Sequence, residues 1–160
     1  MRQDVPNSKY VALAELRFRI REFVRGSDGA AEAAGVEPQH YQMLLALRAM
    51  PHETEANISR LAERLFLKHH SAVGLVDRLE ARGYVRRERS RRDQRQVVVA
   101  LLPRGQRALE KVVRQRLYEL REGGHALVSA LSAILEDNRR AQGPSAQSKT
   151  AARKRKNRKS

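Results

Sequence analysis

Apolar residues recur at three- and four-residue intervals over most of this chain, a spacing that predicts a mainly helical protein. The first helix is expected over residues 10–25, with Ser8 as its N-cap and Gly26 as its end. A short alanine-rich helix over residues 28–34 should follow and stop at Gly35, because glycine readily adopts the left-handed conformation that ends helices.

A third helix should open at Glu37-Pro38, because proline lacks an N–H group that the first helical turn does not need. It should end before Pro51, and residues 52–57 should form a loop with an extended turn near Ala56. Its expected inward-facing residues are Tyr41, Leu44, Leu45 and Leu47.

Two short amphipathic helices then follow each other closely. The first is expected over residues 58–65, capped by Asn57, and the second over residues 69–82, with Gly83 as its C-terminal cap. The residues of the second helix that should anchor it in the core share one face: Ala72, Leu75, Val76 and Leu79.

A hairpin comes next, with strands over residues 85–90 and 95–102 joined by a turn at residues 91–94. A long helix should begin at Pro103, break at Gly123-Gly124 and resume over residues 125–140. The order helix, tight connection, helix, hairpin is that of a winged helix-turn-helix. The predicted fold is therefore mainly α with a small β-wing: a winged helix-turn-helix domain plus N- and C-terminal helices.

The outer helices carry apolar stripes that need a partner. A winged domain of about 70 residues is too small to bury much of three extra helices. We therefore expect residues 10–25 and 103–140 to be dimerisation helices that pack on each other and on a second subunit, and residues 57–102 to be the DNA-binding unit.

The net charge indicates which class of partner the chain binds. The formal net charge is +15 and the isoelectric point is about 11.2, which favours a polyanionic partner, nucleic acid before an anionic membrane. No apolar run is long enough to span a bilayer, and the N-terminus has no export signal, so a cytoplasmic, nucleoid-associated protein is expected. The absence of cysteine excludes disulfide and thiolate chemistry.

The charge is unevenly distributed. Residues 143–160 carry seven Lys or Arg and no acid, so residues 1–142 carry 15 − 7 = +8. This tail has too few large apolar residues to fold, and a disordered segment is expected. It would serve either as a solubilising end or as an arm that tethers DNA without sequence preference.

The predicted second motif helix offers a set of candidate DNA contacts at its N-terminal, outward side. In a helix-turn-helix that end enters the major groove, where histidine and serine bond base edges or phosphates and valine methyls touch thymine. The candidates are His69, His70, Ser71, Val73 and Gly74. Gly74 has two interpretations: tolerated drift, or a position where a side chain would clash with the DNA backbone.

Seven arginines lie between Arg82 and Arg95, against only two acids. Beside a recognition helix they predict contact with phosphates or the minor groove. Asp93 is expected to be structural and to hold Arg95 in one orientation.

These residues resemble the MarR family of bacterial transcription regulators. The specific part is LAERL, LVDRLEARGYVRR, the Asp93-x-Arg95 turn and LPRG before a long helix, all in the family's order. The resemblance implies an obligate homodimer that binds a palindromic operator in double-stranded DNA, with residues 68–74, Lys68 included, reading bases. It also implies wing contacts from Arg91, Arg92 and Arg95.

The resemblance further implies a small aromatic or anionic ligand that releases DNA, although no ligand-binding residue follows from it. Candidates are Phe18, His40, Tyr41 and His52, and these are equally well ordinary core or surface positions. The chain departs from the family at the turn, where Phe66 replaces glycine. It also departs at Lys68, which replaces a capping serine, and at His69-His70, which replaces Arg-Ser.

Four function classes compete. The leading one is a sequence-specific dimeric repressor, and the second is a nonspecific nucleoid-associated protein, which the charge and the tail favour. An enzyme is not supported, since the five histidines lack metal-ligand spacing and no nucleophile–base pair or phosphate loop is present. No metal and no cofactor are expected. The fourth is a winged domain that docks on protein.

Overall fold

The computed structural model describes residues 4–51 and 54–141, with side chains at residues 4–51 and 54–136. The chain divides into two compact units. We call Val24–Glu122 the winged unit, and the described residues of Met1–Phe23 and Gly123–Ser160 the terminal unit. The basic tail expected at residues 143–160 lies outside the described residues.

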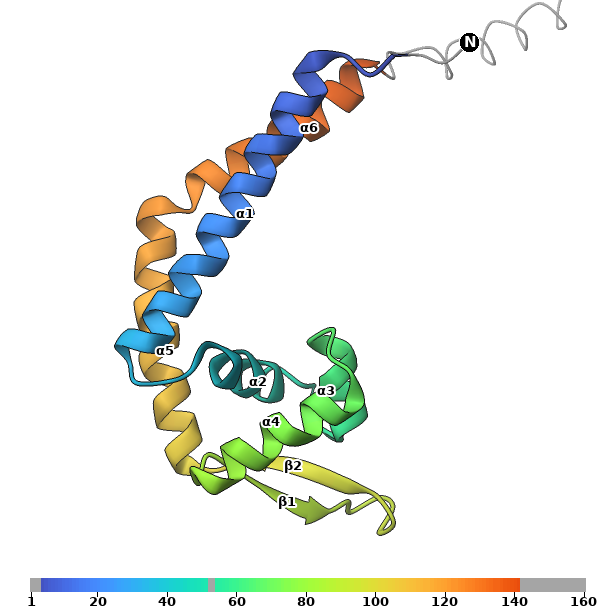
Figure 1. The fold of residues 1–160 in the computed structure, drawn as a ribbon, viewed down its shortest axis with the longest axis vertical. Helices are drawn as coiled ribbons and strands as arrows, with labels where there is room; N and C mark the ends of the chain where they lie inside the picture. The colour runs from blue at the N-terminus through green and yellow to red at the C-terminus, as the bar shows by residue number, and fades with distance from the viewer. Residues whose placement is uncertain (1–3, 52–53, 142–160) are drawn as a thin grey trace, which may run out of the picture. The chain divides into compact units, whose positions relative to one another are not determined.

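The prediction of a mainly helical chain with one small hairpin is confirmed. None of the described helices combines the length and apolar character needed to cross a membrane. The elements, in chain order, are α1 (Asn7–Ala33), α2 (Pro38–Arg48), α3 (Ile58–Arg64), α4 (His69–Ala81), β1 (Val85–Arg89), β2 (Val97–Leu101), α5 (Pro103–Gly123) and α6 (His125–Ala141) (Figure 1).

Helix α1 is continuous, so the predicted stop at Gly26 and the separate helix at residues 28–34 are wrong. Ser8 lies inside the helix and is not its cap. Gly26 faces α5, where a Cβ atom would come within 2.6 Å of Arg116 Nη1. Glycine at this position leaves room for a buried guanidinium rather than ending the helix. The helix ends before Gly35, whose φ of 74° fits the predicted stop.

The core of the winged unit gathers the apolar faces of all its helices. Helix α2 contributes more buried residues to it than any other element, including the fully buried Met43 and Leu44. The prediction that Leu45 faces inward is wrong, since it is 39% exposed. Consecutive helical residues point about 100° apart, and Leu45 lies just outside the arc that the buried residues of α2 occupy. Leu109 and Val112 of α5 complete the core.

The hairpin pairs β1 with β2 antiparallel, from Val85 opposite Leu101 to Arg89 opposite Val97. Both strands are shorter than predicted, because hydrogen bonds within residues 90–96 close the turn instead. A short extended segment before α3 joins the sheet. Val99 donates its N–H to the Ala56 carbonyl at 2.9 Å, which confirms the extended turn expected there.

Two glycines fix how the hairpin meets the helices. Gly83 has a φ of 67° and ends α4 as predicted, with Tyr84 N–H bonded to the Leu79 carbonyl at 2.9 Å. Gly105 lies in the first turn of α5, where a Cβ atom would come within 2.3 Å of the Tyr84 carbonyl oxygen. Only glycine allows α5 to start this close to β1.

The turn between α3 and α4 contains a strained residue. Phe66 has a φ of 54°, a left-handed conformation that costs a residue with a side chain about 1–2 kcal/mol. Its side chain is 97% exposed, so no packing offsets the strain. The departure from glycine noted in the sequence therefore changes the local energy of the turn and leaves its path intact.

Replacing Phe66 with glycine should therefore stabilise the protein. We expect Phe66→Gly to raise the free energy of unfolding by about 1 kcal/mol in urea denaturation at fixed chain concentration. Phe66→Leu is the matched control, because it changes the exposed side chain and keeps the strained backbone. An equal rise in both variants, or a fall in Phe66→Gly, would contradict the strain argument.

Candidate nucleic-acid interface

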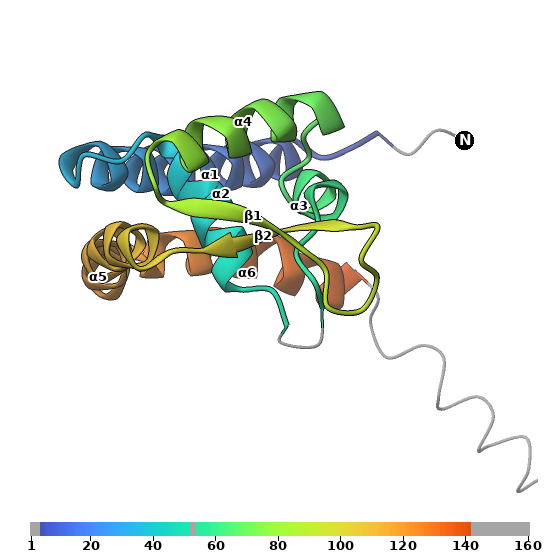
Figure 2. The same cartoon turned by 90° about the horizontal axis from the view of Figure 1, so that it is seen from below.

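The apolar face of α4 sets which side chains of this helix point outward. Four residues of that face lie in the core as predicted, each no more than 2% exposed: Ala72, Leu75, Val76 and Leu79. Helix α4 packs against α3 and β1, and Figure 2 looks onto the side of the winged unit on which α4 and the hairpin both lie. The helix and the hairpin therefore offer one continuous surface.

The first turn of α4 carries most of the predicted base-reading residues. Lys68, His69, His70 and Ser71 are all exposed there, and Lys68, the N-cap residue, makes no side-chain capping bond. Ser59 Oγ of α3 lies 3.3 Å from His69 Nδ1, so the neighbouring helix orients this imidazole. By contrast, Asn57 caps α3 as predicted, and its side chain accepts a 3.0 Å bond from the Arg60 N–H.

Val73 and Gly74 are half-buried, one turn further along α4. A Cβ atom on Gly74 would meet only Arg78 Nη1, at an ordinary 3.8 Å. No contact within the described residues therefore requires glycine at this position. Arg78 is exposed and lies four residues beyond Gly74, on the same side of the helix. Sequence reasoning missed Arg78, although its spacing from His70 and Gly74 could have revealed it.

A buried serine anchors the wing. The Ser90 hydroxyl is completely buried, donates to Glu55 Oε2 at 2.5 Å and accepts the N–H groups of Arg92 and Asp93 at 3.0 and 2.9 Å. The same hydroxyl is the main reason that the pKa of Glu55 is lowered, and N–H groups of Arg91 and Arg92 add to the effect. This contact ties the wing to the loop before α3, and no local sequence signal pointed to it.

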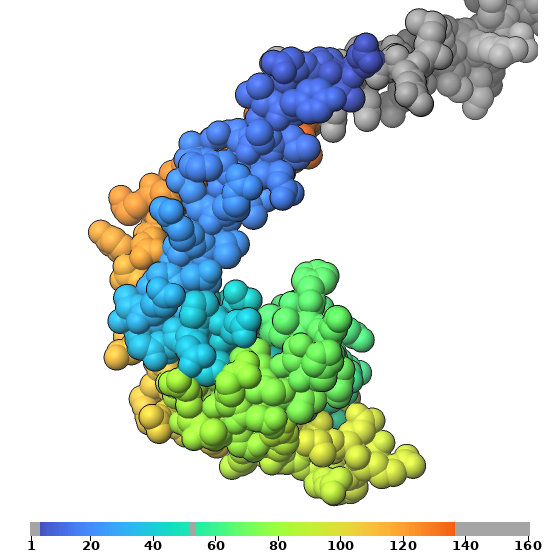
Figure 3. All heavy atoms as spheres, viewed as in Figure 1, coloured from blue at the N-terminus to red at the C-terminus, as the bar shows by residue number. Residues whose placement is uncertain are grey.

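Asp93 acts as the sequence suggested. Its Oδ1 atom accepts the Arg95 N–H at 3.1 Å and the Arg95 Nε at 3.2 Å, and these bonds lower the pKa of Asp93. The Arg95 side chain is nevertheless 92% exposed, so Asp93 holds its Nε atom while most of the guanidinium stays open to solvent. Arg91 and Arg92 are exposed beside it, and Figure 3 shows the hairpin tip projecting past α4.

Not every arginine of the hairpin faces outward. Arg87 reaches back to α4, where its guanidinium lies 2.6 Å from Asp77 and 2.6 Å from Glu80. The Arg87 N–H donates to Glu80 as well, at 2.8 Å, and is the main cause of the lowered pKa of Glu80. This paired arginine joins α4 to β1. Arg87 is one of the seven arginines of residues 82–95, and the sequence did not separate it from those expected to contact DNA.

Two other arginines in this region are also paired. Arg82 bonds Glu37 at 2.5 Å, and Arg86 lies 3.0 Å from Glu88. Among the described residues, no hydrogen bond or ion pair involves the side chains of Arg91 and Arg92. The positive charge of the hairpin that is not paired with an acid in this part of the chain is therefore concentrated towards its tip.

The histidines do not form a metal site within the described part of the chain, where no group of three potential ligand side chains comes together. His40 and Tyr41, two of the ligand-lining candidates, are buried in α2, and burial lowers the pKa of His40. Phe18 is 45% exposed in the terminal unit, and His52 lies outside the described residues.

Residues 34–96 match the model of the MarR family. The HTH-type transcriptional regulator TtmR of Methylorubrum extorquens is 38% identical over 65 residues, which cover 41% of this chain and 33% of that protein. SarZ of Staphylococcus haemolyticus, another HTH-type transcriptional regulator, is 32% identical over 65 residues, which cover 41% of this chain and 44% of that protein. The chain thus spans less than half the length of these relatives.

Solved structures resemble a larger part of the chain. AbsC, a MarR family transcriptional regulator from Streptomyces coelicolor, aligns over 84% of this chain and 97% of its own, with a TM-score of 0.65 and 19% identity. CouR from Rhodococcus jostii, solved bound to p-coumaroyl-CoA, aligns over 77% and 85%, with a TM-score of 0.62 and 20% identity. Both likenesses lie below 25% identity, and they establish the winged helix fold alone.

Removing the Ser90 hydroxyl should loosen the wing. Ser90→Ala leaves the N–H groups of Arg92 and Asp93 without an acceptor, and we expect the free energy of unfolding at pH 7 to fall by about 1–3 kcal/mol. Because the pKa of Glu55 is lowered in the folded protein, its stabilisation is complete above the ordinary pKa of 4.5 and disappears at lower pH. The difference between Ser90→Ala and the unsubstituted protein should therefore narrow as the pH falls from 7 to 3. A difference that stays constant over this range would exclude the Glu55–Ser90 contact as its source.

Proposed function

We propose that this chain, whose residues 34–96 belong to the MarR family of transcription regulators, is a sequence-specific, dimeric DNA-binding regulator. One observation carries the proposal. The first turn of α4 is exposed, Arg91 and Arg92 of the hairpin tip are exposed, and α4 and the hairpin lie on the same side of the winged unit (Figure 2). The related proteins are transcription regulators, and no enzymatic activity is proposed.

The recognition helix reads bases in this proposal. A helix N-terminus in the major groove brings its first residues to the base edges. His69, His70 and Ser71 supply hydrogen-bonding groups there, Lys68 supplies a charge for a phosphate, and Val73 offers methyl groups to thymine. Gly74 is half-buried, and nothing inside the described chain requires glycine there. This supports a close approach of the DNA backbone to this position.

In this proposal the hairpin tip contacts the sugar-phosphate backbone of the DNA beside the recognition helix. Arg91, Arg92 and Arg95 are exposed, and Asp93 orients the last of them. Arginine side chains of this kind bond phosphates or enter the narrow minor groove. Contacts to the backbone fix the register of the protein, and the helix then selects the sequence.

A homodimer is proposed because the terminal unit lacks a core of its own. None of its described side chains is buried, and its large apolar residues are conspicuously exposed. On α6 three of them lie on one face, Val128, Leu131 and Leu135, with 63%, 46% and 49% of their surface exposed. Apolar surface of this extent favours association, and a two-fold dimer would offer two winged units to a palindromic operator.

We further propose repression that a small ligand relieves. An operator-bound dimer of this size obstructs access to the DNA that it covers. CouR was solved bound to p-coumaroyl-CoA, an aromatic and anionic molecule, and this supports the same class of ligand for the present chain. Action on chromosomal DNA implies a cytoplasmic, nucleoid-associated location.

A second candidate is a nonspecific nucleoid-associated protein. The formal charge of +15 favours it, because phosphate neutralisation alone drives strong binding to any duplex. The two candidates differ in the ratio of specific to nonspecific affinity, not in salt dependence.

Selection of bound sequences from random duplexes with the purified protein tests the proposal. A sequence-specific dimer should enrich a palindrome and bind it about a thousandfold or more tighter than a scrambled duplex at physiological salt. An Arg91→Gln/Arg92→Gln variant should lose affinity for both duplexes by similar factors, because phosphate contacts carry little sequence information. Equal affinity for selected and scrambled DNA would instead establish the nonspecific candidate.

The dimer has its own test on α6. Leu131→Glu introduces a charge into the exposed apolar face, and we expect it to convert a dimer to a monomer at micromolar concentration in sedimentation equilibrium. Ser129→Glu is the matched control, because Ser129 is exposed on a different side of the same helix. A monomeric unsubstituted chain, or a Leu131→Glu variant that stays dimeric, would rule out this interface.

A further inference from the structure

A cationic groove runs along α5 within the winged unit. The groove is open to solvent, has a volume of about 560 Å³ and is lined by Tyr84, two alanines and five charged residues of α5. Four of these are cations at three- and four-residue intervals: Arg104, Arg107, Lys111 and Arg114. They lie on a different side of α5 from its buried residues, so they are not needed for the core.

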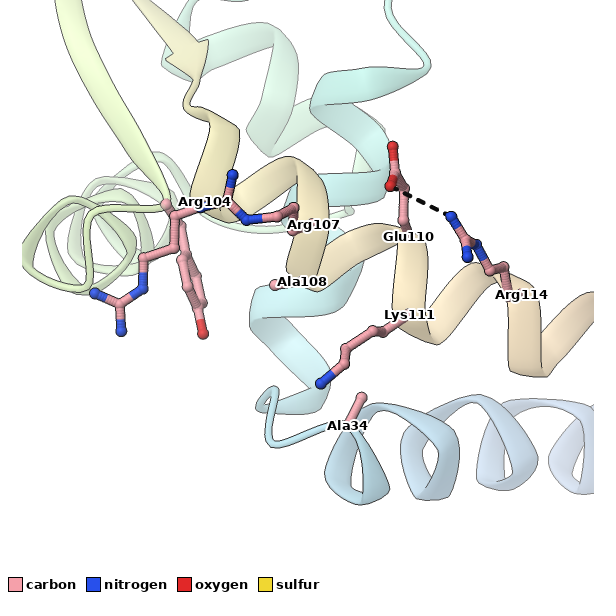
Figure 4. Close-up of a pocket in the computed structure, with 8 residues that line it drawn as sticks. Ala34, Arg104, Arg107, Ala108, Glu110, Lys111 and Arg114 are labelled. Atoms are coloured by element: carbon pink, nitrogen blue, oxygen red, sulfur yellow. Dashed lines mark ion pairs between the residues drawn. The ribbon is translucent and has the colours of Figure 1, made fainter.

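The charge of this groove is poorly balanced. Glu110 is the one acid among the residues that line it, and it is already engaged, 3.8 Å from Arg114 and 2.8 Å from the Gln106 amide that donates to it. Figure 4 shows the Lys111 side chain extending toward Ala34, away from the Glu110–Arg114 pair. Four cations against one acid leave an excess of 4 − 1 = 3 positive charges.

The uncompensated cations have no acidic partner within the described residues. Arg104 lies over the ring of Tyr84, with 5.6 Å between its guanidinium carbon and the ring centroid. Arg107 and Lys111 are exposed and make no ion pair in that part of the chain. Like charges one helical turn apart repel each other, so a bound anion would stabilise this stretch of α5.

We propose that this groove binds a small, multiply charged anion of the phosphorylated-metabolite class. Its volume falls in the range of about 300–1,000 Å³ that small-molecule sites occupy. The first and last of the four cations are ten residue steps apart, roughly 15 Å along the helix, which suits a chain of phosphates better than a single carboxylate. Arginine also matches the geometry of phosphate oxygens.

Tyr84 connects the groove to the recognition helix. Its N–H bonds the Leu79 carbonyl in the last turn of α4 at 2.9 Å, and its own carbonyl accepts the Leu102 N–H at 2.9 Å. Gly105 of α5 packs directly against the same carbonyl, with no room for a side chain between them. An anion that draws Arg104 and Arg107 together would therefore act on the residue that joins α4 to α5. This regulatory consequence rests on the proposed function, whereas binding of the anion does not.

Calorimetric titration of the full chain with sodium tripolyphosphate, at constant ionic strength, tests the site. We expect saturable binding of one anion per chain. Arg107→Gln/Lys111→Gln should weaken it about tenfold or more, as expected for the loss of two charge-assisted bonds. Arg91→Gln/Arg92→Gln removes the same charge from the wing and should change the affinity by less than about twofold. No binding, or equal weakening in both variants, would overturn the inference.

The same variants separate the groove from DNA contact. Both substituted residues of the groove are exposed, and Lys111→Arg, which keeps the charge, should bind tripolyphosphate like the unsubstituted chain. Without tripolyphosphate, the groove variant should bind the selected duplex as tightly as the unsubstituted protein, and the wing variant should not. A groove variant that loses DNA affinity as strongly as the wing variant would identify the groove as a DNA contact and refute the anion site. Intact tripolyphosphate binding in a chain that binds no DNA would instead refute the proposed function alone.

Discussion

The attachment of α4 to the rest of the winged unit is the constraint on which the structure depends. Its apolar face is buried in the core, and its polar flank is paired through Asp77 and Glu80 with Arg87 of the hairpin. The first contact fixes the rotation of the helix about its axis, and the second fixes the hairpin relative to it. Together they keep the helix and the wing arginines on one surface, which a loosely packed helix could not do.

The two units of the chain differ in how their apolar side chains are buried. The winged unit has a continuous core to which α1, α2 and α5 contribute, so it can hold a precise surface within one chain. The terminal unit has no buried side chain among those described and many exposed apolar ones. The proposed dimer would cover these apolar side chains, and it would link the folding of these helices to chain concentration.

The sequence predicted those features that depend on local periodicity or capping. The apolar face of α4, the Asn57 cap, the Gly83 stop and the Asp93–Arg95 pair are all of this kind. The sequence did not predict features that depend on contacts between residues far apart along the chain. Gly26 was interpreted as a helix end because its partner, Arg116, lies 90 positions away, and the Ser90–Glu55 and Arg87–Glu80 contacts also join separate elements. Whether the candidate site residues read DNA stays a prediction.

Hydroxyl-radical footprinting of the protein on its best selected duplex tests the central claim most directly. If α4 and the wing engage DNA from one surface of each subunit, protection should appear as two symmetry-related clusters about one helical turn apart or a multiple of it. Each cluster should extend into a flanking minor groove on the wing side, and Arg91→Gln/Arg92→Gln should remove that flanking part alone. A single unsymmetrical footprint, or flanking protection that survives in the wing variant, would contradict the account.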